Sequence, residues 1–544
     1  MSAVAGTGTL TKLALRRDRL MIPGWLYALA ASVVGSAASF RSLYGEQSQR
    51  ADLARSMNAS GPLRALYGPV YDWNSIGALT GWRMGVLGAA LAGLMSILLV
   101  VRHTRDEEES GRQEMLTATA IDRRAPLTAA LSAAATANAA IFVVIAAGMA
   151  VLGQALAGSV ALGLQIAGGG LMFGAIAAVT AQVTESARLA RGLAGAVLGA
   201  AFLLRGAGDA ASADSGSAAV WASPLGWLEH LRPYDTGGES WWVLLPTAAL
   251  TAAAVAAAYA LAARRDSGAG LLPARPGPAT GARWLNGPFA LAWRLQRGAF
   301  YGWAFGLAVA GALYGSVTRS VGDLIGDNAQ VNDIIERMGG HRGLTDSFLA
   351  LTMGLLGIMA SVFAVQSVLR LRAEENGLGA EAVLAHPVGR LRWAASHLAL
   401  AVLGPAVLLA VAGALMGLIY GTAVSDIGGQ LPRLTFAAVA QAPAVWVLAG
   451  LGTLLFGLLP RAVPGIWGLL GLFLALGQLG PVLRVPQPVM DLSPFTHLPG
   501  LPGGHSDRVL PLSATPYLWL LLVAAAAFAV GLAGLRRRDL TAGA

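Results

Sequence analysis

Two short acidic segments contain the residue types and the spacing that could carry chemistry in this chain. The first acidic segment is DEEESGRQEML at 106–116, and the second acidic segment is RAEENGLGAEAVL at 372–384. Each follows a long apolar run. Clustered carboxylates can form an acid–base pair or can make ion pairs with arginine. A membrane enzyme would need one acidic pair near the membrane, and that reading leaves the second copy unexplained.

Each acidic segment continues into a stretch compatible with a short helix. Glutamates at a helix N-terminus and an arginine near its far end oppose the partial charges of the helix, so a capped surface helix is one reading. Two equivalent helices also suit a partner with twofold symmetry, and this docking reading is favoured. Small apolar residues offer a docking face: Met115, Leu116, Ala118, Val383, Leu384 and Ala385. The charged residues assigned to docking, within 106–124 and 373–391, are Glu107, Glu108, Glu109, Glu114, Arg123, Glu374, Glu375, Glu381 and Arg390.

The composition places the elements around these segments in a membrane. The chain has 544 residues, of which 55% are hydrophobic and 12% are charged. So few charges cannot cover a soluble globule of this length. There is no cysteine, which excludes disulfides and thiolate metal sites. The net charge of +9 is typical of arginines gathered on the inner side of a membrane, so no nucleic acid partner is expected.

Twelve apolar runs are long enough to cross the hydrocarbon core as helices. The sequence therefore predicts an all-α polytopic membrane protein. The apolar runs are rich in alanine and glycine, which allow close helix packing. The predicted spans are 21–40, 79–101, 127–152, 156–181, 189–205, 241–263, 299–318, 347–369, 395–420, 436–459, 463–483 and 514–535.

The arginines predict the orientation of these spans. The first run lacks a cleavage site in the usual frame and reads as a retained span. With the N-terminus inside, most basic residues fall in cytoplasmic segments, and twelve spans return the C-terminus to the same side. We therefore expect a multi-pass protein of the bacterial plasma membrane with both termini in the cytoplasm.

The chain repeats itself. LALRRDRLMIPGWLYALA at 13–30 is similar to LAWRLQRGAFYGWAFGLA at 291–308, and the acidic segments align at a shift of 267. Six spans in each half predict two parallel six-helix repeats related by an axis along the membrane normal. The predicted domains are a first half at 1–263, a cytoplasmic linker with an elbow helix at 264–290, and a second half at 291–544.

These motifs together resemble a known transporter family. EEESGRQEMLTATAIDR and EENGLGAEAVLAHPVGR are similar to the first cytoplasmic loop of ABC-2-type (type V) exporter permeases. NGPFALAWRLQRGAF before span seven resembles the elbow helix of that family, which lies along the membrane surface. SPLGWLEHLRPY and SPFTHLP resemble its external segment between spans five and six. The twelve spans on one chain resemble the actinobacterial polyketide-antibiotic exporters of the tetronasin type.

The resemblance implies a division of labour between subunits. The permease would export hydrophobic or amphipathic antibiotics and drugs, while ATP and Mg²⁺ would bind two copies of a separate ATPase, expected to be a homodimer. No cofactor is expected in this chain itself. The sequence has no phosphate-binding loop, since its one lysine, Lys12, is not part of that motif. The family implies that 221–242 forms a re-entrant cap, whereas composition alone fits an ordinary interfacial loop equally well.

Two other functions stay open at this point. An ion-coupled multidrug antiporter would need a buried acidic or histidine relay, and the predicted spans show almost no deep charge. A polytopic lipid-modifying enzyme is the other alternative. No histidine motif indicates a metal, and the substrate-binding residues are unknown. The polar residues in the spans are expected to hydrogen-bond between helices: Asn138, Gln165, Gln366, Gln441 and Gln478. The tryptophans are expected to anchor at the membrane interface: Trp82, Trp303, Trp446 and Trp467.

Overall fold

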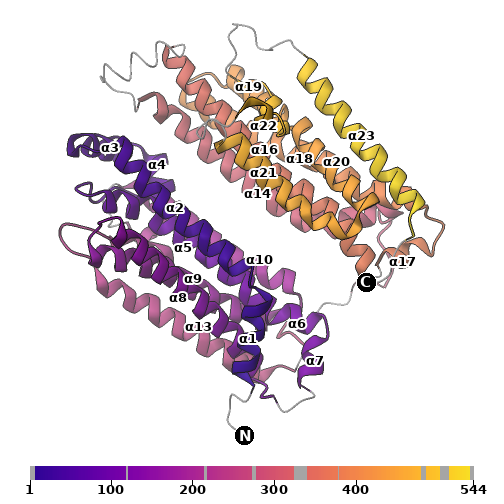
Figure 1. Cartoon of the computed structure of the whole chain (residues 1–544), viewed down its shortest axis with the longest axis horizontal. Helices are drawn as coiled ribbons and strands as arrows, with labels where there is room; N and C mark the ends of the chain where they lie inside the picture. Colours follow the sequence, from indigo (N-terminus) through magenta and orange to yellow (C-terminus); the bar gives the residue numbers. More distant parts are fainter. Residues whose placement is uncertain are drawn as a thin grey trace. The chain divides into compact units, whose positions relative to one another are not determined.

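All regular elements in the described residues of the computed structural model are helices. Contacts divide the chain into two compact units, Met1–Gly277 (unit 1) and Pro278–Ala544 (unit 2). In Figure 1, helices α1 to α13 belong to unit 1 and helices α14 to α23 belong to unit 2. The structure describes residues 6–117, 121–212, 217–266, 268–272, 277, 279–323, 340–377, 379–479, 486–502 and 514–539.

Twelve helices or helix pairs in the described residues are long and apolar enough to cross a membrane. This confirms the prediction of an all-α membrane protein with twelve spans. Unit 1 contributes α2 (Met21–Leu43), α5 (Ile76–Arg102), α8 (Ala125–Val151), α9 (Leu156–Val183), α10 (Ala187–Ala211) and α13 (Leu244–Arg264). Unit 2 contributes α14 (Pro288–Asp323), α16 (Gly340–Asn376), α18 (Arg390–Ala423), α19 (Ile427–Val439) with α20 (Ala442–Leu458), η2 (Pro460–Gly465) with α21 (Ile466–Leu479), and α23 (Thr515–Arg537).

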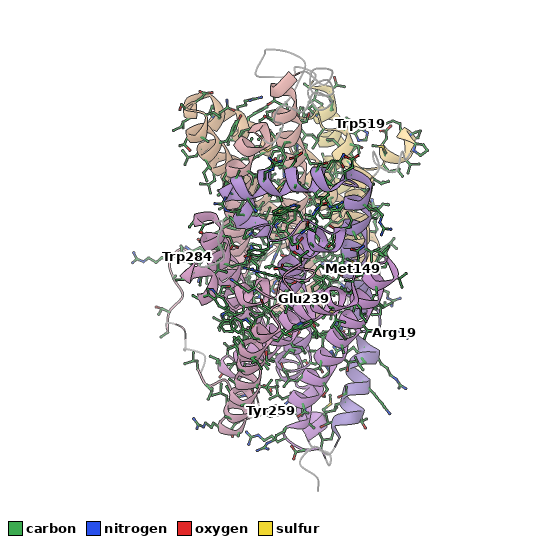
Figure 2. The ribbon with its side chains drawn as sticks, turned by 90° about the vertical axis from the view of Figure 1, so that its left-hand side faces the viewer. Arg19, Met149, Glu239, Tyr259, Trp284 and Trp519 are labelled. Atoms are coloured by element: carbon green, nitrogen blue, oxygen red, sulfur yellow. The ribbon has the colours of Figure 1, made fainter. Side chains whose placement is uncertain are left out.

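Helix α9 is the central helix of unit 1. It packs against α5, α8, α10 and α13, and most of its residues are buried. Small residues allow this approach: a Cβ at Gly169 would lie 2.7 Å from the carbonyl oxygen of Ala89 on α5. Near the far end of α13, the hydroxyl of Tyr259, labelled in Figure 2, shares a 2.7 Å hydrogen bond with Thr128 of α8.

In unit 2, α16 contacts α14, α18 and α20, as α5 contacts α2, α8 and α9 in unit 1. Helix α20 packs closely on α23, as α9 packs on α13. The tenth span consists of two helices because α19 ends at Val439 and α20 begins at Ala442, with Pro443 in its first turn. Proline has no N–H to continue the helical ladder and fits best at a helix start.

The short elements lie at the ends of the spans. Unit 1 has α1 (Thr7–Arg17), α3 (Gln47–Ala59), α4 (Gly61–Tyr67), α6 (Arg105–Glu109), α7 (Arg112–Thr117), α11 (Ala218–Ala222), α12 (Pro224–Glu229) and η1 (Trp241–Val243). Unit 2 has α17 (Gly379–Leu384), α22 (Gln487–Met490) and η3 (Pro494–His497).

The two units enter their first spans differently. In unit 1, α1 is separate from α2, and the buried Asp18 lies at the break, with Arg102 at 2.7 Å and His103 at 2.5 Å. Arg19 is exposed in this break (Figure 2). In unit 2, the predicted elbow helix at 286–300 is continuous with span seven, because α14 runs unbroken from Pro288 to Asp323. That its start lies along the membrane surface stays a prediction. Gln296 there stays helical and hydrogen-bonds His397 at 3.1 Å.

Candidate functional site

The first acidic segment is tied into unit 1 by Glu108. Its side chain is 5% exposed and lies between two arginines. Arg105 donates to Oε2 at 2.6 Å, and Arg265 donates to both carboxylate oxygens at 2.6 and 2.9 Å. A carboxylate held by a two-pronged arginine is among the strongest polar contacts in a protein. Glu108 therefore stabilises the chain itself and is not available at the surface.

Its acidic neighbours have partners as well. Glu107 pairs with Arg17 and with Arg112, and its contact to Arg112 is 2.8 Å. Glu109 accepts the backbone N–H of Ala187 at 2.7 Å, which caps the first turn of α10. The first acidic segment is therefore attached to α1 and α10, and Glu107 and Glu108 lie in the first turn of α6 as predicted.

The second acidic segment begins inside a spanning helix. Glu374 and Glu375 lie in the last turn of α16, so the prediction that they cap the N-terminus of a following helix is wrong. Glu374 pairs with Arg370 at 2.5 Å. Glu375 is held by Arg372 at 3.1 Å and by both terminal nitrogens of Arg538 at 2.7 and 2.9 Å.

The predicted arginines Arg123 and Arg390 also bind the chain itself. Arg123 precedes α8 and donates to the backbone carbonyl of Arg265. Arg390 is the first residue of α18 and donates to the backbone carbonyl of Arg538 at 2.8 Å. Each of them thus satisfies a carbonyl just beyond the last spanning helix of its own unit.

A smaller exposed surface is left on the two acidic segments. On α7, Glu114 is exposed and Met115 is 68% exposed. On α17, Glu381 is exposed in the first turn, while Val383 and Leu384 pack partly against the core of unit 2. Ala385 just after α17 is exposed. Ala118 and the side chain of Leu116 lie outside what the structure describes.

Unit 1 contains a buried ionic cluster that the sequence reading missed. Arg205 and Asp209 on α10 are 0% and 1% exposed, and Glu229 at the end of α12 is 6% exposed. Nη1 of Arg205 lies 3.0 Å from Asp209 and 3.3 Å from Glu229. Its Nη2 donates to the carbonyls of Ala65 and Leu66 at 2.9 and 3.1 Å. Both α10 residues lie within the last seven residues of that helix, so the expectation of almost no charge deep in the spans stays a prediction.

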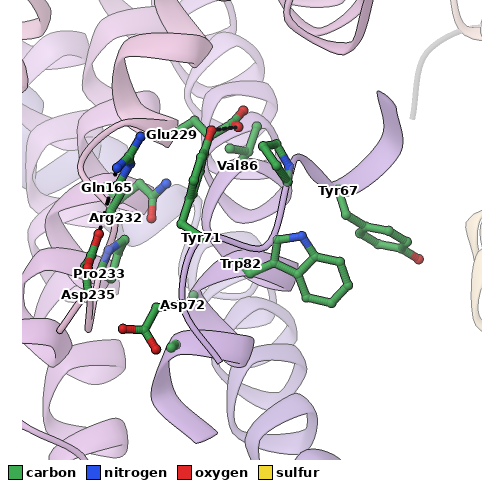
Figure 3. A pocket seen from close by; sticks show the side chains of 13 residues that line it. Tyr67, Tyr71, Asp72, Trp82, Val86, Gln165, Glu229, Arg232, Pro233 and Asp235 are labelled. Carbon is green, nitrogen blue, oxygen red and sulfur yellow. Dashed lines mark hydrogen bonds and ion pairs between the residues drawn. The ribbon is translucent and has the colours of Figure 1, made fainter. Parts of the chain in front are cut away.

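Tyr71 completes this cluster. Its hydroxyl donates to Glu229 at 2.9 Å, and Arg232 lies over its ring at 4.1 Å (Figure 3). Burial, together with the charge of Glu229, raises the pKa of Tyr71, so the phenol stays a neutral donor. The available signal in the sequence was the i, i+4 spacing of Arg205 and Asp209 at the end of an apolar run.

A cavity of ≈ 30 Å³ lies next to this cluster. That is enough room for ordered water but not for a drug-sized molecule. Gln165 lines it; its Nε2 donates to the carbonyl of Leu228 at 2.9 Å, and its buried Oε1 accepts no hydrogen bond from the described part of the chain. Among the described residues, no group of three metal-ligating side chains is present. Other residues that line the cavity include Trp82, Asp72, Pro233 and Asp235 (Figure 3).

The other polar residues of the spans mostly join helices. Asn138 on α8 donates to Ser96 of α5 at 2.8 Å, and Trp303 on α14 donates to Gln366 of α16 at 3.0 Å. These contacts confirm interhelical hydrogen bonding for Asn138 and Gln366. Gln441 is buried beside Gly357. The side chain of Gln478 lies outside the described part. Trp82 and Trp446 donate to carbonyls of Gly68 and Val402, and Trp467 is 41% exposed.

The segment 221–242 folds back against unit 1. Leu225 and Leu228 of α12 are fully buried, and Trp221 stacks on Trp242 with ring centroids 5.5 Å apart. Ser223 donates to the carbonyl of Ala201 on α10 at 2.7 Å. In unit 2, the Ser493 that precedes η3 donates to a carbonyl of α21 at 3.3 Å. The re-entrant cap stays a prediction.

Comparison with known proteins assigns the chain to a family. Residues 285–536 match the family model described as the C-terminal domain of the multidrug efflux system permease Rv1217c. The whole permease protein Rv1217c of Mycobacterium tuberculosis (strain ATCC 25618 / H37Rv) is 45% identical over 539 residues, covering 99% of this chain and 96% of the relative. Identity at that level over nearly the full length of both proteins shows common descent. The chain therefore belongs to the family of multidrug efflux system permeases that includes Rv1217c.

Proposed function

We propose that this chain is the membrane permease subunit of an ATP-binding-cassette exporter for hydrophobic or amphipathic antibiotics and drugs. Membership of the multidrug efflux permease family is the observation that carries this proposal. The twelve apolar spans supply a membrane pathway, and the sequence contains no phosphate-binding loop to power it. Hydrolysis of ATP, with its Mg²⁺, is therefore assigned to separate subunits, and the chain itself carries no catalytic site.

Two ATPase copies would each hold one acidic segment. The exposed parts of α7 and α17, around Met115 and Glu381, supply the docking surface, because Glu108 and Glu375 are buried in ion pairs. In this arrangement the chain spans the plasma membrane, and the arginine-rich ends of the units face the cytoplasm. Both termini lie on the same cytoplasmic side. The two parallel repeats would then present equivalent levers to a twofold ATPase pair.

Ion-coupled antiport is a second candidate because of one observation. Asp209 and Glu229 are buried carboxylates beside a small cavity, and buried acidic groups in membrane proteins often take part in ion transport. The two candidates differ in their energy source. Reconstituted chain with its ATPase is expected to export a fluorescent lipophilic drug only when ATP is present. Export driven by a proton gradient without ATP would instead support the antiporter.

The docking surface gives a direct prediction. Met115→Asp combined with Ala385→Asp is expected to lower the amount of co-purifying ATPase by about tenfold or more, since it puts charge into an apolar contact. Met115→Leu with Ala385→Ser is the matched control and should bind as the wild type does. Both variants should keep the wild-type thermal stability in detergent, because both positions are exposed. If the Asp variant co-purified as much ATPase as the wild type does, the result would contradict this docking surface.

A further inference from the structure

The residue directly after the last spanning helix of unit 1 holds four elements together. Arg265 follows α13 and grips Glu108 with two hydrogen bonds of 2.6 and 2.9 Å. Its Nε donates to Gln182 at the end of α9 at 2.7 Å. Its carbonyl accepts the side chain of Arg123, two residues before α8. One arginine thus joins α6, which directly follows α5, to the ends of α8, α9 and α13.

The corresponding residue of unit 2 makes three contacts of the same kind or at the same place. Arg538 follows α23 and grips Glu375 at 2.7 and 2.9 Å. Its guanidinium lies 4.8 Å from the ring centre of Phe456 near the end of α20, and its Nε has no hydrogen-bond partner among the residues that the structure describes. Its carbonyl accepts Arg390 of α18 at 2.8 Å. A cation–π contact here takes the place of the hydrogen bond to Gln182.

The two arrangements, which we name arginine–glutamate locks, match in one glutamate and three arginines. Arg105 and Arg372 donate to Oε2 of the same two glutamates at 2.6 and 3.1 Å. Arg372, Glu375 and Arg390 each lie 267 positions after Arg105, Glu108 and Arg123. Each lock is internal to its unit, and Glu108 and Glu375 are 5% and 2% exposed. Independent ion pairs that merely filled a surface would not repeat both arginine partners of the glutamate together with the carbonyl contact.

We propose that Arg265 and Arg538 are positioning residues of the transport cycle. Each lock makes the acidic segment and the ends of four spans move as one body. A displacement of the acidic segment is therefore transmitted to the sixth span of its unit, α13 or α23, and is not absorbed by a flexible loop. The proposal rests on the proposed function for its source of movement, whereas the lock itself is a property of this chain alone.

Hydrogen–deuterium exchange on the detergent-purified chain tests the lock without any partner. Arg265→Ala is expected to speed amide exchange across 105–117 by about tenfold or more, because a buried two-pronged ionic contact is lost. Arg538→Ala should do the same across 372–384. Each variant should leave the acidic segment of the other unit at the wild-type rate. The matched controls are Arg264→Ala and Arg537→Ala, adjacent exposed arginines of the same helix ends, which should change neither segment.

Transport with the ATPase present separates positioning from simple stability. Arg265→Ala and Arg538→Ala are expected to keep ATP hydrolysis within about twofold of wild type while drug export falls about tenfold or more. Arg265→Lys and Arg538→Lys, which keep the charge, should recover part of the export. A purely structural role would lower hydrolysis and export together with the amount of folded protein.

The outcomes are distinguishable. Exchange rates of the alanine variants equal to those of their neighbour controls would overturn the lock. Faster exchange with hydrolysis and export falling in parallel would overturn the positioning role. If the wild-type chain and its ATPase export no lipophilic drug tested, the proposed function fails, and the exchange result still decides whether the lock exists.

Discussion

Replacing Arg205 with alanine is expected to lower the free energy of unfolding of the chain by about 3–5 kcal/mol, the cost of leaving a buried charge without its partner. Asp209 and Glu229 would remain buried with no guanidinium between them. The carbonyls of Ala65 and Leu66 would lose their donor as well. Denaturant titration in detergent micelles, followed by circular dichroism, measures this change.

A matched control separates this effect from the loss of any arginine. Arg55 pairs with Asp52, and these side chains are 79% and 66% exposed. Arg55→Ala is therefore expected to cost no more than about 1 kcal/mol. A triple change of Arg205→Met, Asp209→Asn and Glu229→Gln should recover part of the loss, because it removes all the buried charges together. An Arg205→Ala variant as stable as Arg55→Ala would show that the cluster is not held by this arginine.

The number and approximate position of the spans followed from the sequence because apolar length alone forces a helix across a bilayer. The end of span five did not follow. It was predicted at residue 205, whereas α10 continues to Ala211. Hydropathy treats Arg205 and Asp209 as the end of an apolar run, but they pair with each other inside the helix and are buried against Glu229. Only the tertiary structure brings Glu229 to that position.

For the acidic segments too, the local pattern could be predicted from the sequence, and the long-range contacts could not. The sequence pattern correctly located one charged helical segment near the end of the second span in each unit. It placed Glu374 and Glu375 after a helix end, whereas their pairs with Arg370 and Arg372, four and three residues earlier, are compatible with continuing α16 to Asn376. The partner Arg538 lies 163 residues from Glu375, and no spacing rule in a single sequence points to it.

The continuity of the predicted elbow with span seven in unit 2 could not be predicted for a related reason. The elbow was expected from the family resemblance, and the repeat aligns this stretch with the start of the chain, where α1 does form a separate helix. Two aligned positions differ. Asp18 is bound at the break by Arg102 and His103 at the end of α5, whereas the aligned Gln296 lies inside a continuous helix. Pro23 in the first turn of α2, which has no N–H for a continuous helix, is aligned with Tyr301. A short polar side chain such as aspartate competes with helical backbone bonds more strongly than glutamine does.

The contact between α20 and α23 depends on glycines, at which the backbones of the two helices approach each other directly. A Cβ built at Gly457 would lie 1.9 Å from the carbonyl oxygen of Gly531, and one at Gly531 would lie 2.5 Å from the carbonyl oxygen of Thr453. Real Cβ atoms do not approach other heavy atoms so closely, and backbone atoms cannot rotate away. The two helices must therefore separate if either glycine gains a side chain.

Gly457→Ala is accordingly expected to lower the free energy of unfolding by about 3 kcal/mol, the upper part of the usual range for overpacking a core. Gly471→Ala on α21 is the matched control, since a Cβ there meets nothing within 4 Å. Alanine favours a helix over glycine by about 0.5–1 kcal/mol, so the control should be neutral or stabilising. Denaturant titration in detergent gives both values, and equal stability changes would mean that α20 and α23 do not pack through Gly457. Because α23 carries Arg538 directly after its last turn, the same change is expected to loosen the lock of unit 2 and to speed amide exchange across 372–384.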